Sequence, residues 1–195
     1  MRKFFLVSLF ATLIGLLQGC TTVASSSAQA LYNHHSLEKN ATDVYLTLQG
    51  YRALDIDSDH FRAANINVAT FNRIALLSGQ ALSAKQRIEA EAIVRKIEGM
   101  NQVYNWITLE KPTSLWAHLN DAWLTTKIKA QLLASNGVDA SQVKVVTENR
   151  TVFLMGTLRP SEARAALTIA STTEGVQQVV KIFSYLNLSK IPLEG

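Results

Sequence analysis

Hydrophobic and polar residues follow two different periods in the second half of the chain. Between residues 120 and 135, Leu124, Ile128 and Leu132 repeat every four positions, which predicts a helix with one buried face. The stretch "VKVVTE" from Val143 alternates apolar and polar side chains, which predicts a strand. A wholly apolar strand, "VFLMG", then precedes a helix that begins at Pro160-Ser161 and a last strand, "QQVVKIFSYL". The predicted order is helix, strand, strand, helix, strand.

The same order occurs earlier in the chain, because the sequence is duplicated. Residues 65–109 align with residues 142–186, and the helices upstream of them, 43–54 and 120–135, align as "TDVYLT" and "NDAWLT". The aligned positions include Thr70 with Thr147, Asn72-Arg73 with Asn149-Arg150, and Gly79 with Gly156. A unit of this length is a small domain rather than a solenoid repeat.

Each unit predicts one hairpin between its first two strands. Asn72-Arg73 and Asn149-Arg150 mark the turns, since asparagine tolerates the left-handed conformation of a tight hairpin. Gly50 interrupts the first helix of the first unit, at a cost of about 1 kcal/mol relative to alanine. We expect an α+β protein with two tandem α-β-β-α-β domains, residues 42–110 and 111–190. Each would be a three-stranded mixed sheet with two helices on one face.

The N-terminus has the pattern of a targeting segment. Arg2 and Lys3 precede an apolar run that is too short for a comfortable membrane span and ends in Leu17-Gln18-Gly19-Cys20. This ending resembles a bacterial lipobox, and the resemblance implies a signal peptide over residues 1–19 and acyl chains, palmitate among them, on Cys20. Thr21 in place of aspartate implies sorting to the outer membrane. The polar stretch up to residue 41 predicts a flexible tether.

Composition and motifs give no sign of an enzyme or a cofactor. Hydrophobic residues make up 48% and charged residues 17%, which is typical of a globular protein. The net charge of +4 is too small to indicate nucleic acid, and the four histidines are adjacent or isolated, which disfavours a metal site. The sequence lacks the serine-hydrolase, zinc-protease and phosphate-loop motifs, and "DIDSDH" from Asp55 lacks the glycine and glutamate of a calcium loop. We therefore expect no catalysis, no cofactor and no metal.

The order of elements, the hairpin, the L-x-G that closes the second strand and the E-G before the last strand resemble the BON domain. Two copies behind a lipobox resemble the dual BON-domain outer-membrane lipoproteins. That resemblance implies a lipid-anchored protein that faces the periplasm, contacts anionic phospholipid such as phosphatidylglycerol and supports envelope integrity. It also implies enrichment at division sites.

The helix "HLNDAWLTTKIKAQLLA" has a second apolar stripe, which the sheet of its own domain does not need. On a wheel of about 100° per residue, Leu119, Lys127 and Ala130 fall within about 40° of Trp123, opposite the face that Leu124, Ile128 and Leu132 form. Trp116 would join this stripe only if the helix began early, which Pro112 and the cap candidate Asn120 disfavour.

The residue types of this stripe suit a membrane surface. Tryptophan is at home at the headgroup level, and lysine can present its ammonium to phosphate. Residues Trp123, Lys127 and Lys129 match positions that the family resemblance assigns to phospholipid contact, and Leu119 and Ala130 are added from the wheel. The first unit has Tyr45, Gln49 and Tyr51 at the positions of Trp123, Lys127 and Lys129. Its residues 43–110 carry seven basic and eight acidic side chains, against nine and six in residues 111–195, so lipid contact is predicted for the second unit.

Three hypotheses follow from the sequence. The leading one is a lipid-anchored module that binds anionic phospholipid through the second unit. The alternative is an adaptor that docks an envelope-assembly machine, such as outer-membrane assembly proteins, or another lipoprotein. In that case Trp123 packs between the two domains, or an apolar patch around Tyr104 and Trp106 contacts the partner. A glycan binder is the third, disfavoured because the aromatic residues interleave with core positions.

Overall fold

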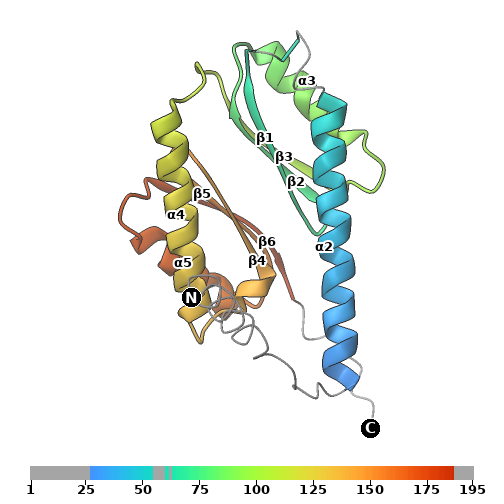
Figure 1. The fold of residues 1–195 in the computed structure, drawn as a ribbon, viewed down its shortest axis with the longest axis vertical. Helices are drawn as coiled ribbons and strands as arrows, with labels where there is room; N and C mark the ends of the chain where they lie inside the picture. Colours follow the sequence, from blue (N-terminus) through green and yellow to red (C-terminus); the bar gives the residue numbers. More distant parts are fainter. Residues whose placement is uncertain (1–26, 55–59, 62, 187–195) are drawn as a thin grey trace, which may run out of the picture. The chain divides into compact units, whose positions relative to one another are not determined.

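The computed structural model describes residues 27–54, 60–61 and 63–186, with side chains from Asn40 onward (Figure 1). The first copy contains α2 (Ser27–Leu54), β1 (Asn65–Phe71), β2 (Ile74–Gln80), α3 (Ala84–Arg95) and β3 (Gln102–Thr108). The second contains α4 (Leu115–Ala134), η2 (Ala140–Gln142), β4 (Val143–Glu148), β5 (Thr151–Leu158), α5 (Pro160–Thr172) and β6 (Gln178–Tyr185). The predicted signal peptide, Cys20 and the aspartates from Asp55 to Asp59 lie outside the described residues.

Each copy folds around a three-stranded mixed sheet, as predicted. In the first sheet β2 lies in the middle, antiparallel to β1 and parallel to β3. In the second sheet β5 lies in the middle, antiparallel to β4 and parallel to β6. The parallel pair is possible because α3 or α5 forms the crossover between its strands. The α+β fold class and the tandem arrangement are thereby confirmed.

Both helices of a copy cover the same face of its sheet. In the first copy Leu54 of α2 and Ala90 and Val94 of α3 share one core with Ala75 and Leu77 of β2. In the second copy the equivalent core combines side chains of α4, α5, β4 and β5, namely Ile128, Leu132, Ala166, Ala170, Val145, Val152 and Leu154. Side chains alternate along each central strand, so the next residues, Leu76 and Phe153, point to the opposite face.

These opposite faces meet in a third apolar cluster, which joins the two copies. Leu76 from the first sheet packs with Phe153, Met155 and Ile182 from the second, and the Trp106 and Phe153 rings form a T-shaped contact with centroids 5.6 Å apart. Polar contacts cross the same boundary: Lys144 Nζ donates to the Thr70 carbonyl at 2.8 Å. The two copies therefore contact each other through their sheets.

Both hairpins have the tight, left-handed turns that the Asn-Arg pairs predicted. Both residues of each turn have positive φ, 48° and 62° at Asn72 and Arg73, and 46° and 60° at Asn149 and Arg150. Two consecutive residues of this kind form a type I′ turn, which matches the twist of a two-residue hairpin.

A buried aspartate on the preceding helix holds each turn in place. Asp43 accepts hydrogen bonds from the backbone N–H of Asn72 and Arg73, at 2.7 and 3.0 Å. Asp121 accepts from Asn149 and Arg150 in the same way, at 2.7 and 2.9 Å. Both carboxylates are buried, with 6% and 5% of their surface exposed. This clamp, repeated in both copies, fixes where the first helix of each domain lies on its sheet.

Two expectations about the first helix need correction. Helix α2 begins at Ser27, so residues 27–41 are helical where the sequence analysis expected part of a flexible tether. Its residues include Leu, Ala, Glu and Lys without proline, and a helix extends readily through good helix formers once it has nucleated. The helix also continues through Gly50, which the sequence analysis took for an interruption.

The reason for Gly50 is close packing, because a Cβ atom there would lie 2.8 Å from Val68 Cγ1. We expect Gly50→Ala to lower the free energy of unfolding by about 1–2 kcal/mol, since overpacking outweighs the gain in helix propensity. Urea unfolding of the single and double variants measures this. Val68→Ala should cost less in the Gly50→Ala protein than in the wild type, and a Gly50→Ala protein more stable than wild type would contradict the packing argument.

Candidate functional site

The candidate site lies on α4, which is longer than predicted. The helix begins at Leu115 and is capped by Ser114, whose Oγ accepts a hydrogen bond from the Ala117 backbone N–H at 3.4 Å. The expected start near Asn120 was therefore wrong. Pro112 precedes the cap and does not interrupt the helix, since it lies outside the helical residues. As a consequence, Trp116 belongs to the helix.

One face of α4 is buried against its sheet, as predicted. Leu124, Ile128 and Leu132 are at most 1% exposed, and Asp121 on the same side binds the hairpin turn. Four side chains at this spacing anchor the helix along more than three turns. The orientation of the opposite face is thereby fixed.

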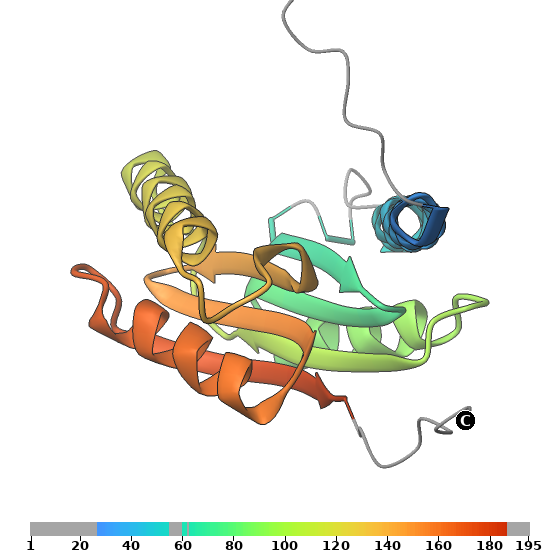
Figure 2. The same cartoon turned by 90° about the horizontal axis from the view of Figure 1, so that it is seen from below.

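The outer face of α4 presents large apolar side chains to solvent. Figure 2 shows that no other described element covers the outer side of this helix. Trp116, Leu119 and Trp123 are 81%, 52% and 53% exposed, and Ala130 is exposed too. With Lys127 these residues fall within about 40° of Trp123 on the wheel, and we call them the outer stripe. Trp123 is not part of the apolar cluster between the two copies.

Lys127 contacts the aromatic ring of Trp123 directly. Its Nζ lies 4.6 Å from the ring centroid, in the range of a cation–π interaction. The contact holds a positive charge and an aromatic ring side by side on one exposed helix face. Such a pair can bind a ligand that has an anionic group next to an apolar part.

Lys129 points elsewhere, because two residues along a helix turn the direction by about 200°. It lines a separate hollow of about 240 Å³ with Leu132, Leu133 and Val143. The structure thus brings Leu119, Trp123, Lys127 and Ala130 together and places Lys129 beside them, near β4. Leu133, which lines this hollow with Lys129, is 75% exposed.

A further lysine, Lys144, lies close to Lys129 and is partly buried. Burial lowers the pKa of the Lys144 ammonium, Asp43 opposes this effect, and the positive charge of Lys129 adds to it. The Lys144 ammonium donates a hydrogen bond to the Thr70 carbonyl and so stabilises the contact between the two copies. Lys144 is therefore not part of the candidate site.

The first copy uses the equivalent positions differently. Tyr45, the counterpart of Trp123, is 56% exposed, but its neighbour at the Lys127 position is Gln49. The counterpart of Lys129 is Tyr51, whose hydroxyl accepts a hydrogen bond from the Val68 N–H at 3.1 Å. The aromatic residue is kept in this copy, whereas the two positive charges are absent.

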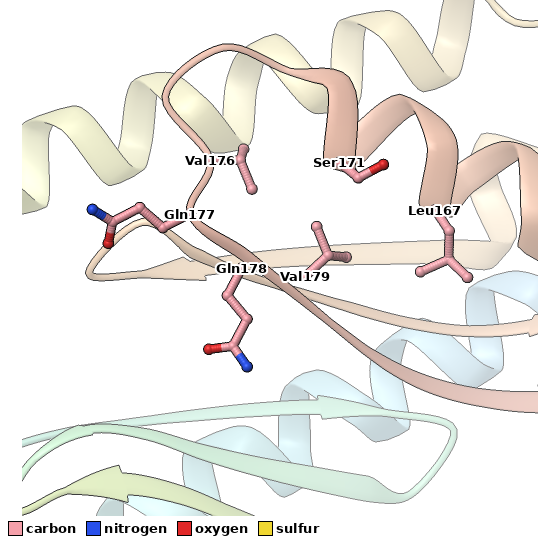
Figure 3. Close-up of a pocket in the computed structure, with 6 residues that line it drawn as sticks. All are labelled: Leu167, Ser171, Val176, Gln177, Gln178 and Val179. Atoms are coloured by element: carbon pink, nitrogen blue, oxygen red, sulfur yellow. The ribbon is translucent and has the colours of Figure 1, made fainter.

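Other hollows and residue clusters in the described part of the chain are weaker candidates for a binding site. A hollow of about 350 Å³ lies between α5 and β6, and no charged side chain lines it. Leu167, Ser171, Val176 and Val179 lie around it (Figure 3). Among the described side chains no three His, Cys, Asp or Glu residues come together in a way that would hold a metal ion. No helix in the described part of the chain is both long and apolar enough to cross a membrane.

Comparison with known proteins identifies the family to which the chain belongs. The family model of the BON domain matches residues 43–111 and 120–187, and the chain therefore belongs to the BON-domain family, with two copies of the domain. The resemblance inferred from the hairpin and glycine motifs is confirmed.

Several curated proteins are similar over much of their length. The outer membrane lipoprotein DolP of Haemophilus influenzae is 32% identical over 175 residues, which cover 88% of this chain and 91% of that protein. A 21 kDa hemolysin of Actinobacillus pleuropneumoniae is 38% identical over 133 residues, 68% of this chain and 69% of the hemolysin. The osmotically-inducible protein Y of Escherichia coli is 31% identical over 131 residues, 66% of this chain and 65% of that protein.

Proposed function

We propose that this chain is a lipid-anchored protein of the outer membrane that faces the periplasm and binds anionic phospholipid through α4 of its second BON domain. Binding occurs without catalysis and supports the integrity of the envelope, and the protein is enriched at division sites. The name of the Haemophilus influenzae relative supports the localisation. The single observation that carries the lipid assignment is the exposed Trp123 ring with the Lys127 ammonium 4.6 Å from its centroid.

The side chains of the outer stripe suit the polar and apolar levels of a membrane surface. The indole of Trp123 is apolar but keeps a polar N–H, so it favours the level of the headgroups. Lys127 beside it would lie among the phosphates, where each basic residue contributes roughly 1 kcal/mol near an anionic leaflet. Leu119 and Trp116 extend the apolar surface toward the start of the helix, and Lys129 adds positive charge at its flank.

The form of the adaptor hypothesis that places Trp123 between the two domains receives less support. A protein-binding seam between the domains would need Trp123 in the contact between the copies, but that contact consists of residues such as Leu76 and Phe153 from the two sheets. A lysine next to an exposed tryptophan favours phosphate over a purely apolar partner. Docking to an outer-membrane assembly machine remains the alternative if lipid binding fails.

The decisive experiment compares vesicles of different charge. Residues 21–195 should float with phosphatidylglycerol vesicles and stay behind with phosphatidylcholine vesicles at the same lipid concentration. Equal binding to both kinds of vesicle would argue against recognition of the anionic headgroup. Absence of binding to either would leave the adaptor hypothesis in the lead.

Acylation of Cys20 is tested separately. We expect Cys20→Ala to abolish incorporation of radiolabelled palmitate and to leave an uncleaved precursor, because the thiol is the acceptor of the lipid. Thr21→Ala is the control and should incorporate palmitate normally. If the Cys20→Ala protein takes up palmitate at the wild-type level, the lipobox interpretation is wrong.

A further inference from the structure

A small hollow at the contact between the two copies contains acidic and aromatic side chains. Its volume is about 150 Å³, and both copies line it: Trp106 and Glu110 belong to the first, Glu148 and Gln178 to the second. By this measure one water needs about 10–15 Å³, so a group of several heavy atoms fits. The hollow shares no lining residue with the outer stripe on α4.

Glu148 is a buried carboxylate that has no positive partner among the described residues. It is 8% exposed, and its two oxygens accept hydrogen bonds from the amides of Asn67 and Gln80, at 2.9 and 2.8 Å. Within the described part of the chain it makes no ion pair. Because a buried charge is costly unless a counter-charge accompanies it, this carboxylate favours a cation in the hollow.

Trp106 and Glu110 complete a surface that suits a cation. Trp106 is 40% exposed, and its ring meets Phe153 in a T-shaped contact at an interplanar angle of 65°, so part of the indole is open to solvent. Glu110 is exposed and brings a second carboxylate to the same hollow. Gln178 points away from Leu167 and Ser171 of α5, as Figure 3 shows, and its amide lines the hollow as well. Indole faces attract ammonium groups, most strongly when the charge is partly desolvated.

The duplication shows that the fold does not require these side chains. At the positions that correspond to Trp106, Glu110 and Glu148, the other copy has Ile182, Leu186 and Phe71, all apolar. The two copies have the same order of helices, strands and hairpins. Only the positions of Trp106, Glu110 and Glu148 combine carboxylates with an indole. Glu148 also joins the two copies through Asn67 and Gln80, whereas Trp106 and Glu110 are exposed and open to a ligand.

We propose that this hollow binds the side-chain ammonium of a lysine from a partner polypeptide. The ammonium lies between the Glu110 and Glu148 carboxylates, and its methylene stem packs on the Trp106 ring. Four methylenes and one nitrogen fit the available volume, and the amides of Gln178 and Asn149 at the rim can bond the partner's backbone. The proposal concerns a second site, independent of the phospholipid surface on α4.

The test uses the full acylated chain in phosphatidylcholine nanodiscs, labelled with 5-fluorotryptophan. The protein has three tryptophans, and Trp→Phe variants assign the three fluorine signals. We expect Nα-acetyl-lysine methylamide to shift the Trp106 signal in a saturable manner and to leave the signals of Trp116 and Trp123 unchanged. The norleucine analogue, which lacks the ammonium, should shift none of them.

Charge variants complete the test. Glu110→Gln should weaken binding of the lysine amide about tenfold or more, because it removes one charge-assisted hydrogen bond from an exposed side chain that the fold does not need. Glu98→Gln, at an exposed glutamate outside the hollow, is the matched control and should bind as wild type. Phosphatidylglycerol vesicles should bind the Glu110→Gln and wild-type proteins equally, which separates this site from the α4 surface.

Three results would overturn the proposal: an equal shift with the norleucine amide, unchanged affinity in the Glu110→Gln protein, or no shift of Trp106 with the lysine amide. Dihexanoyl phosphatidylethanolamine serves as an ammonium from a lipid source. If it shifts the Trp106 signal at lower concentration than the lysine amide, the ligand is a lipid headgroup and the assignment to a partner polypeptide is wrong.

Discussion

Replacing Trp123 with alanine is expected to weaken binding to phosphatidylglycerol vesicles by about 1.5–3 kcal/mol, roughly a tenfold to hundredfold rise in the dissociation constant. The side chain is 53% exposed, so a large apolar area is available to leave water at the headgroup level. Since this contribution is apolar, the loss should be similar at low and high salt. Vesicle flotation at two ionic strengths measures it.

Lys127→Glu, in contrast, should weaken vesicle binding in a salt-dependent manner. Reversal of this charge should weaken binding strongly at low salt and less at high salt, because exposed charges are screened beyond about 8–10 Å at physiological ionic strength. The variant also loses the contact between the ammonium and the Trp123 ring. A combined Trp123→Ala and Lys127→Glu protein should therefore lose less than the sum of the two single losses.

The first copy supplies matched controls for both changes. Tyr45→Ala and Gln49→Glu alter the corresponding positions of α2, where the aromatic residue has no lysine beside it, and should change vesicle binding little. Thermal unfolding of each variant must be compared with wild type, so that loss of fold is not taken for loss of binding. Folded Trp123→Ala and Lys127→Glu proteins that bind phosphatidylglycerol as well as wild type would refute the proposed surface.

The fold was predictable because its signals are local and occur twice. The period of four in Leu124, Ile128 and Leu132 identified the buried face, and the Asn-Arg pairs identified both hairpins. The mixed sheet followed from the order of the elements, since a helix between two strands allows them to run parallel. Duplication strengthened each inference, because a chance pattern would not recur at the same spacing.

The start of α4 was not predictable from the same signals. Ser114 and Asn120 are both good capping residues, and the apolar residues between them, such as Trp116, face solvent and give no amphipathic pattern. Lys129 was grouped with Lys127 because the family resemblance assigns both positions to phospholipid contact, although a helix directs the two side chains to different sides. Gly50 was taken for a helix breaker because its contact with Val68 is a tertiary one.

The sequence contains only one sign of the aspartate clamp: Asp43 in "TDVYLT" aligns with Asp121 in "NDAWLT". Asp121 precedes the turn that it binds by 28 and 29 positions, so no local rule connects them. At the start of the predicted helices, residues 43–54 and 120–135, an aspartate suggests capping or interaction with the helix dipole. Only the tertiary structure shows that both carboxylate oxygens accept from the hairpin.

This clamp should dominate the stability of each domain. We expect Asp121→Ala to lower the free energy of unfolding by roughly 2–4 kcal/mol, because it leaves two backbone N–H groups of a strained turn without their charged acceptor. Asp121→Asn should fall between alanine and wild type, since one amide oxygen can accept from one N–H while the amide nitrogen faces the other. Urea unfolding followed by circular dichroism gives the values.

Asp43→Ala tests whether the clamp acts in the same manner in the first copy, where the two distances are 2.7 and 3.0 Å. A loss of similar size is expected, because burial and geometry are nearly the same at both sites. Glu174→Ala removes an exposed carboxylate of the second copy and should change stability by less than about 0.5 kcal/mol. The clamp would be refuted if Asp121→Ala and Glu174→Ala unfolded at the same urea concentration.

Since Asp121 and Trp123 share one helix, Asp121→Ala should also weaken vesicle binding at temperatures where the hairpin has loosened, whereas Asp43→Ala should not.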